Sequence, residues 1–263
     1  MPEMLEVEYY RRMAEGCLGR PVRSVEVADP HCLRGATTPA ALRRALSGRE
    51  LTGARRLGKL LLLDTAGPTL GIRFGMTGGL ILDQQTAVDR LLYSPPNVDA
   101  KWVRFTIRFA DGGGLDLHDP RRMGRVELEP DERALGPDAF GVTPAGLRSA
   151  LSSRPPSPGP PLKARLQDQA HLAGVGNLLA DEVLWRAGLS PERPSGSLSD
   201  PELRRLHRHL RRTLDDLLER GGSHTGDLMA ERRPGGHCPR DGTPLRRGKV
   251  GGRTTWWCPR HQH

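Results

Sequence analysis

The spacing of apolar residues changes near residue 135, and this change most constrains how the chain can fold. Between about residues 55 and 130, apolar and polar side chains alternate, most clearly over residues 103–109. Alternation of this kind is typical of strands with one buried face, and turns such as the glycine run after Asp111 separate these strands. Short strands joined by turns predict an antiparallel β-sandwich, with a flanking helix over residues 3–16.

Beyond residue 135 the patterns are helical. Ser199-Asp200-Pro201-Glu202 is a capping box, and leucines then recur every three or four residues as far as Gly221-Gly222. These signals predict one long amphipathic helix. Two shorter helices are expected over residues 162–171 and 177–188, and the Pro/Ser-rich stretch 154–161 before them is expected to be a loop.

The chain is basic, with 40 Lys and Arg against 31 Asp and Glu and a formal net charge of +9 among 263 residues. Such a surplus suits a polyanion such as nucleic acid or an anionic membrane surface, although an ordinary basic globular protein carries the same signal. No apolar run approaches the roughly 18 residues that a membrane span needs. The start lacks the pattern of a signal peptide, and four cysteines argue against a disulfide scaffold. We therefore expect a cytoplasmic protein with no membrane partner.

Two similar segments near the C-terminus, Cys-Pro-Arg-Asp and Cys-Pro-Arg-His, have the spacing of a zinc ribbon. Sixteen residues separate Asp241 from Cys258. This spacing predicts a β-ribbon finger with one structural Zn²⁺. The predicted ligands are Cys238, Asp241, Cys258 and His261. Aspartate is an uncommon ligand in structural sites, so His237 or His263 is an alternative, and a metal-free hairpin is the other interpretation.

The N-terminus offers a nucleophile if Met1 is removed, because Pro2 then carries a secondary amine. An α-amino group titrates at about pH 8, so part of it is unprotonated at neutral pH. Such an amine can attack a masked aldehyde, for example the sugar C1′ of DNA, and form a Schiff base. The adjacent Glu3 could transfer the proton that this attack requires. The other interpretation is a terminus that only caps a helix.

Three further segments contain glycine-bounded turns that allow a backbone to approach a phosphate or a base closely. They are Gly75-Met76-Thr77-Gly78, Asp119-Pro120-Arg121-Arg122-Met123-Gly124 and Gly174-Val175-Gly176-Asn177. Each alone also fits an ordinary exposed turn, and Asn177 also fits a plain helix N-cap.

The order of these motifs along the chain resembles that of the formamidopyrimidine-DNA glycosylase and endonuclease VIII family. Residues 1–8 resemble its opening, Met-Pro-Glu-Leu-Pro-Glu-Val-Glu, and residues 55–62 resemble the strand that bears its essential lysine. The turns at 75–78 and 119–124 are similar to its two void-filling loops. Residues 163–182 resemble its helix–two-turns–helix, and 252–259 resemble the arm of its zinc finger.

The resemblance implies a DNA repair glycosylase and abasic-site lyase that acts as a monomer on duplex DNA with damaged bases or abasic sites. It implies Pro2 as nucleophile, Glu3 as the acid that opens the sugar ring, and Glu6 as support at the DNA. Lys59 and Arg253 would complete the catalytic site by holding phosphates of the extruded nucleotide. The other residues implied to contact DNA are Lys163 and Asn177 at phosphates, and Met76, Arg121 and Met123 in the gap that the extruded base leaves.

The expected α+β protein has a β-sandwich domain over residues 1–135, a helix–two-turns–helix domain over 136–235 and a β-ribbon finger over 236–263, with DNA between the first two. Four features depart from the family. Leu5 replaces a proline, Met123 stands in place of a phenylalanine, only 15 residues separate Gly222 from Cys238, and half of the finger's cysteines are absent. One rival hypothesis is a catalytically silent DNA-binding paralogue, and another is an RNA-binding protein. Pro2, Glu3 and Lys59 together argue against the first, and the Pro2-Glu3 start argues against the second.

Overall fold

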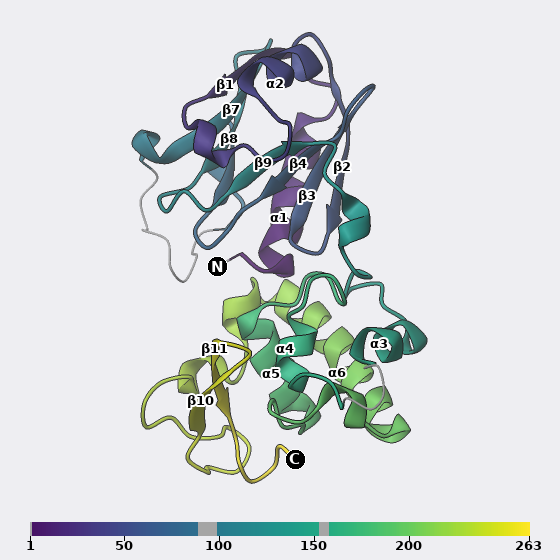
Figure 1. Ribbon diagram of the computed structural model, residues 1–263. Coiled ribbons are helices and arrows are strands. Elements are labelled where there is room, and N and C mark those ends of the chain that lie inside the picture. The colour runs from purple at the N-terminus through teal and green to yellow at the C-terminus, as the bar shows by residue number, and fades with distance from the viewer. Residues whose placement is uncertain (1, 89–98, 153–157) are drawn as a thin grey trace. The chain divides into compact units, whose positions relative to one another are not determined.

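The computed structural model describes residues 2–88, 99–152 and 158–263. Two of the sequence features therefore lie outside the described residues, namely Met1 and the first half of the predicted 154–161 loop. The chain divides into two compact units, Met1–Glu132 and Arg133–His263 (Figure 1). The domain boundaries expected at residues 135 and 235 stay predictions.

The first unit contains two antiparallel sheets. One has the strand order β1-β7-β8-β5-β6 and the other β2-β3-β4-β9. The strands are β1 (Val22–Val27), β2 (Leu51–Leu57), β3 (Leu60–Thr65), β4 (Leu70–Arg73), β5 (Gly79–Leu82), β6 (Gln85–Thr86), β7 (Val103–Phe109), β8 (Gly114–His118) and β9 (Arg125–Leu128). The helices are α1 (Met4–Ala14) and α2 (Pro39–Leu46), with short 3-10 turns at Glu15–Cys17, Pro30–Cys32, Ala100–Trp102 and Glu132–Ala134.

The sandwich core forms where the alternating residues of the two sheets face each other. Phe105, Ile107 and Phe109 of β7 are buried in one cluster with Leu61 of β3 and Tyr10 of α1. Burial of each such side chain contributes roughly 1.5–3 kcal/mol. The predicted sandwich and its N-terminal helix are therefore confirmed. Strand β1 and helix α2 had no counterpart in the sequence interpretation.

The second unit is helical and ends in a β-ribbon. Its elements are α3 (Pro144–Leu151), α4 (Leu162–Leu166), α5 (Asn177–Ala187), α6 (Asp200–Glu219), β10 (Arg246–Val250) and β11 (Arg253–Trp257), with 3-10 turns at Ser195–Ser197, Ser223–Thr225 and Met229–Glu231. Helix α6 begins at the predicted capping box, in which Ser199 and Glu202 bond reciprocally. Its leucine face is buried, as the periodicity predicted. Among the described residues, no helix is both long and apolar enough to span a bilayer.

Helix α4 is shorter than the predicted helix over residues 162–171 because side chains beyond Leu166 bind the backbone. Asp168 accepts a hydrogen bond from the amide of Ala170 (3.1 Å). The Gln169 amide group donates to the carbonyls of Gln167 (2.8 Å) and Val175 (3.0 Å). Such local bonds compete with the helical ladder and end it.

Candidate active site and metal centre

The start of α1 holds two buried carboxylates in a capping box. Glu3 is the N-cap residue, and its side chain accepts a hydrogen bond from the amide of Glu6. The Glu6 carboxylate accepts in return from the amide of Glu3, at 2.7 Å. Pro2 is itself buried, and Glu3 and Glu6 are 0% and 2% exposed. The box therefore fixes the backbone directly after Pro2. Glu6 is placed to support the N-terminus, and its predicted DNA contact stays a prediction.

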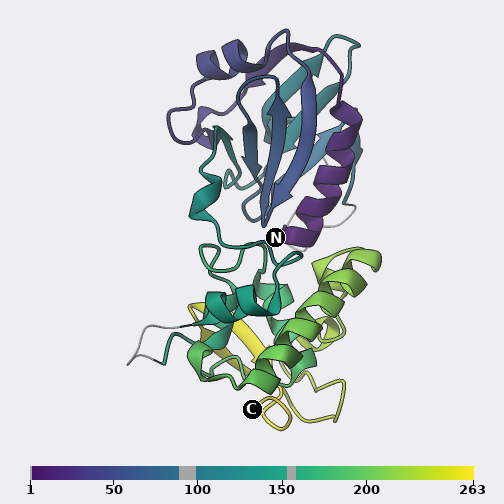
Figure 2. The same ribbon diagram turned by 90° about the vertical axis from the view of Figure 1, so that its right-hand side faces the viewer.

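Lys59 lies in the two-residue turn between β2 and β3, not within a strand as the resemblance suggested. Gly58 adopts a left-handed conformation (φ +58°) that this turn requires. Arg56 donates to the Gly58 carbonyl (3.0 Å) and pairs with Glu8 of α1 (3.2 Å). Figures 1 and 2 both show the first turn of α1 and this β2–β3 turn at the same end of the first unit. The fold therefore gathers Pro2, Glu3 and Lys59 at one end.

Two turns carry the residues predicted to fill the duplex. Met76 is half-buried in the turn between β4 and β5, whereas Arg121 and Met123 are exposed between β8 and β9. Met123 is 42% exposed, one of the two large hydrophobic side chains that stand out at the surface of the described residues. The buried carboxylate of Asp119, which the sequence interpretation did not single out, accepts hydrogen bonds from both turns.

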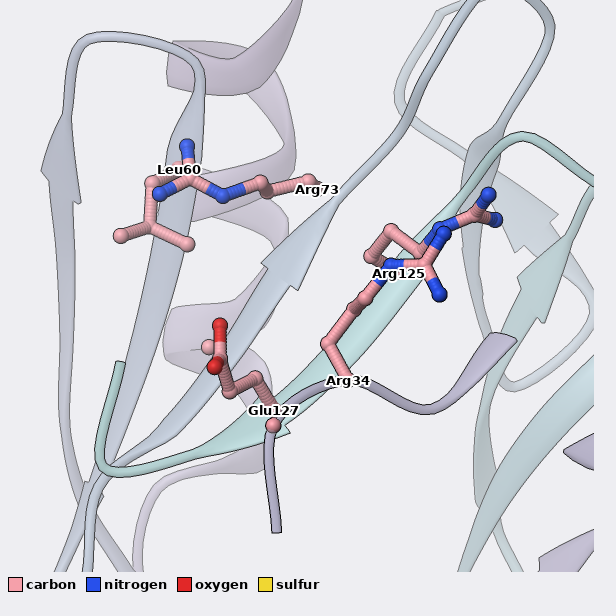
Figure 3. A pocket seen from close by; sticks show the side chains of 7 residues that line it. Arg34, Leu60, Arg73, Arg125 and Glu127 are labelled. Carbon is pink, nitrogen blue, oxygen red and sulfur yellow. The ribbon is translucent and has the colours of Figure 1, made fainter. Parts of the chain in front are cut away.

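A cavity of about 270 Å³ on the first unit is lined by three arginines (Figure 3). Its lining residues are Arg34, Gly35, Leu60, Gly71, Arg73, Arg125 and Glu127. Leu60, the first residue after the β2–β3 turn, is paired with Arg73 of β4, and Arg73 is paired with Arg125 of β9. Arg73 and Arg125 therefore lie on adjacent strands in line with that turn. Burial lowers the pKa of Arg73, and the Glu127 carboxylate opposes that shift. Sequence reasoning missed this cluster because its residues come from separate segments. The one local signal was an arginine at the end of an apolar strand.

Lys163 is fully buried, with its ammonium group held inside the second unit. It pairs with Asp181 of α5 at 2.7 Å and donates to the Thr254 carbonyl (3.1 Å) and the Thr255 hydroxyl (2.7 Å). Asp181 also pairs with Arg232 at 2.7 Å. In this conformation Lys163 does not face a surface that DNA can reach. Its ammonium group thus binds β11, and the predicted phosphate contact, which stays a prediction, would require the side chain to leave this buried site.

Arg253, in contrast to the buried Lys163, is exposed at the first position of β11. The ribbon turns through Gly251 and Gly252, both with positive φ. A Cβ at Gly251 would lie 2.7 Å from Ala164 of α4, so the turn packs directly on that helix. The ribbon turn directly before Arg253 is therefore held in place by its packing against α4.

The turn before α5 is held by the side chain of Gln169. Its carbonyl oxygen accepts from the Gly174 amide (2.9 Å), and Asn177 accepts from Gln167 (3.2 Å). Gly176 occupies the N-cap position, so the alternative that Asn177 is a plain N-cap is wrong. Asn177 is the first residue of α5 and lies at the end of the helix where free amides and the dipole favour an anion.

The four predicted metal ligands converge. Their ligand atoms all lie within 4.8 Å of one another in a cluster of Cys238, Asp241, Cys258 and His261. His261 directs Nδ1 toward the Cys238 sulfur (3.5 Å), while Nε2 lies 3.1 Å from the Trp185 carbonyl oxygen. The second contact orients the ring, as outer partners of metal-binding histidines do. The cluster can hold a metal ion, and the alternatives His237 and His263 are not part of it.

Comparison with known proteins places these features in a family. The model of the formamidopyrimidine-DNA glycosylase N-terminal domain matches residues 1–126, and that of the H2TH domain matches 135–228. Proteins named formamidopyrimidine-DNA glycosylase from Geobacter metallireducens and Thermus thermophilus are each 35% identical to the chain. The first comparison covers 100% of both proteins, and the second 98% of this chain and 97% of the relative.

Solved structures give the same result. The Lactococcus lactis Fpg protein in complex with DNA containing an abasic site is 27% identical, with a TM-score of 0.81. The complex with DNA containing N7-benzyl-Fapy-dG is 28% identical, with a TM-score of 0.82. Both comparisons cover 100% of each chain. Because two family models together span most of the sequence and full-length relatives exceed 30% identity, this chain belongs to the formamidopyrimidine-DNA glycosylase family.

Proposed function

We propose that this protein is a DNA glycosylase of base-excision repair that removes oxidatively damaged bases and then cleaves the abasic site through Pro2. The observation that carries the proposal is the buried Glu3–Glu6 capping box at the N-terminus of a chain from a glycosylase family. A helix start needs only one side-chain oxygen to cap it. Two buried carboxylates beside Pro2 favour acid–base chemistry at its amine once Met1 is removed.

The chemistry that follows from these residues is a Schiff-base pathway. The unprotonated Pro2 nitrogen attacks C1′, and the damaged base leaves with the electrons of the glycosidic bond and takes up the proton lost from that nitrogen. Glu3 protonates the ring oxygen as the sugar opens, which leaves an iminium between Pro2 and C1′. Loss of a proton from C2′ of the resulting iminium expels the 3′-phosphate. A second elimination expels the 5′-phosphate, and water then releases the enzyme.

Damaged duplex DNA is the proposed substrate, because the structural relatives are complexes with DNA that contains an abasic site or a Fapy-dG lesion. The first unit contributes cations at Lys59, Arg73 and Arg125, and the ribbon contributes Arg253. Such contacts to phosphates fix the position of the strand without reading its sequence.

We infer that the metal in the finger is zinc. The two thiols, the imidazole nitrogen and the carboxylate of the cluster form a four-ligand set of the kind that tetrahedral Zn²⁺ accepts. Zinc bound there would join the Cys238 loop to the Cys258 loop, directly after β11. Its role would be to hold the ribbon that carries Arg253, not to take part in bond cleavage.

Borohydride trapping tests the function. The native protein, incubated with duplex DNA containing an abasic site, should become covalently attached to the DNA because the reduced Schiff base is stable. Pro2→Gly should trap far less, and a protein that retains Met1 should not trap. Lys101→Met, which alters an exposed lysine, serves as the matched control and should trap normally.

Two outcomes would contradict the proposal. Undiminished trapping with a blocked N-terminus would move the chemistry to an internal lysine. Tight binding of the duplex without any trapping or strand cleavage would support the silent DNA-binding paralogue.

A further inference from the structure

The two turns that carry Met76, Arg121 and Met123 are joined through one buried carboxylate. Asp119 is 0% exposed. Its Oδ1 atom accepts hydrogen bonds from the Thr77 hydroxyl at 2.7 Å and from the Arg121 amide at 3.2 Å. Its Oδ2 atom accepts from the amides of Met123 (2.6 Å) and Gly124 (2.5 Å). One side chain thus binds the turn between β4 and β5 and the turn between β8 and β9.

Direct packing reinforces the connection between the two turns. A Cβ at Gly75 would lie 2.6 Å from the carbonyl carbon of Met123, so the turns are in contact at a position where only glycine fits. Gly75 also has a positive φ of 59°. Substitution there is therefore unfavourable for two independent reasons.

The outer side of the second turn is fixed as well. Arg122 has a left-handed backbone conformation (φ +57°), uncommon for a residue with a side chain. Its guanidinium group makes two hydrogen bonds to Asp29, at 2.6 and 3.0 Å. Arg122 thus binds Asp29 of its own unit, while its neighbours Arg121 and Met123 are exposed.

We propose that Asp119 is a positioning residue that makes residues 75–78 and 119–124 one rigid wedge, so that Met76, Arg121 and Met123 enter the duplex together. The proposal deepens the proposed function, on which it rests. A preorganised wedge loses little conformational freedom when it replaces a base in the stack, whereas two independent turns would each have to be ordered during extrusion.

The wedge predicts a substrate-dependent defect. A damaged base that is still stacked must be expelled, so its excision depends on the wedge. An abasic site has no base to expel, so its cleavage depends on Pro2 and on the phosphate contacts. Loss of the Asp119 network should therefore slow the first reaction and largely spare the second.

Thr77→Val is the cleanest variant, because it keeps the shape of a buried side chain and removes the hydroxyl that joins the turns. A hydrogen bond to a charged group is strong enough for its loss to slow excision of a stacked lesion about tenfold in single-turnover assays. Asp119→Asn should have a larger effect, since one carboxamide oxygen cannot serve donors that approach both carboxylate oxygens. Thr77→Ser should restore the rate. Cleavage of a preformed abasic site should change less than about threefold in all three variants.

Asp111→Asn is the matched control. It makes the same charge change in the β7–β8 turn, where Asp111 accepts from the Gly113 amide at 2.9 Å. This variant should excise and cleave at the native rates. A 2-aminopurine placed opposite the lesion gives a second readout, because wedge insertion unstacks it. The rise in its fluorescence on binding should be slower with Thr77→Val than with Thr77→Ser.

Native excision rates for stacked lesions in both Thr77→Val and Asp119→Asn would overturn the proposal. So would an equal loss on both substrates, since that pattern indicates a general defect. If Asp119→Asn does not fold, Thr77→Val and Thr77→Ser still decide the question. Failure of the proposed function would look different, because the unsubstituted protein would then excise no base.

Discussion

Replacing Lys163 distinguishes a buried anchor from a phosphate contact. Lys163→Met keeps most of the apolar stem and removes the ammonium group that binds Asp181, Thr254 and Thr255. The pair is fully buried on both sides, so solvent does not screen it. Breaking a buried ion pair by removing one partner typically costs about 3–5 kcal/mol. Arg232 still pairs with Asp181, so we expect about 3 kcal/mol, at the lower end of this range.

Urea unfolding followed by tryptophan fluorescence measures this loss, since Trp185, Trp256 and Trp257 all lie in the second unit. DNA binding at several salt concentrations supplies the second measurement. A phosphate contact removed from duplex DNA lowers the salt slope by about 0.9. We expect this reduction for Lys59→Met, and no reduction for Lys163→Met beyond weaker binding at every salt concentration.

Lys249→Met, at an exposed position of β10, is the matched control for stability. It should leave the urea midpoint unchanged. A Lys163→Met protein with native stability and a salt slope reduced by about 0.9 would refute the argument. Lys163 would then be a phosphate contact whose side chain leaves its buried site when DNA binds.

Three further predictions concern the metal, pH and substrate choice. Metal analysis of the purified protein should find about one zinc per chain. Cys258→Ala should lose this zinc and, with it, DNA affinity. Active protein without zinc would contradict a structural ion. Arg193 and Ser199 lower the pKa of Glu202 to about 2, so its contribution to stability is complete above its ordinary pKa of 4.5 and is lost as the pH falls toward 2. Glu202→Gln should therefore flatten the acid limb of the stability curve below pH 4.5, and an unchanged limb would contradict this. Met123 in place of an aromatic residue weakens stacking on the opposite base by about 0.5–1.5 kcal/mol. Abasic sites and ring-fragmented lesions should therefore be cleaved faster than 8-oxoguanine opposite cytosine, and equal single-turnover rates would contradict this.

Local patterns predicted the elements that depend on neighbours in the sequence. The alternation in β7, the capping box of α6 and its leucine face all follow from periods of two or of about 3.6 residues. The metal cluster was also predictable, because four ligands in two short segments of a ribbon can meet in few ways. The length of α4 was not, since it depends on side chains that bind the backbone after Leu166.

The sequence by itself determined the order of sandwich, helices and ribbon, and it identified the four residues of the candidate metal cluster. Only the tertiary structure decided which charges are buried. Lys163 meets Thr255 across 92 positions of sequence, and Thr77 meets Asp119 across 42. Whether a lysine contacts phosphate or anchors a strand depends on such distant partners, because burial and hydrogen bonding are set by the residues packed around a side chain and not by those beside it in the chain.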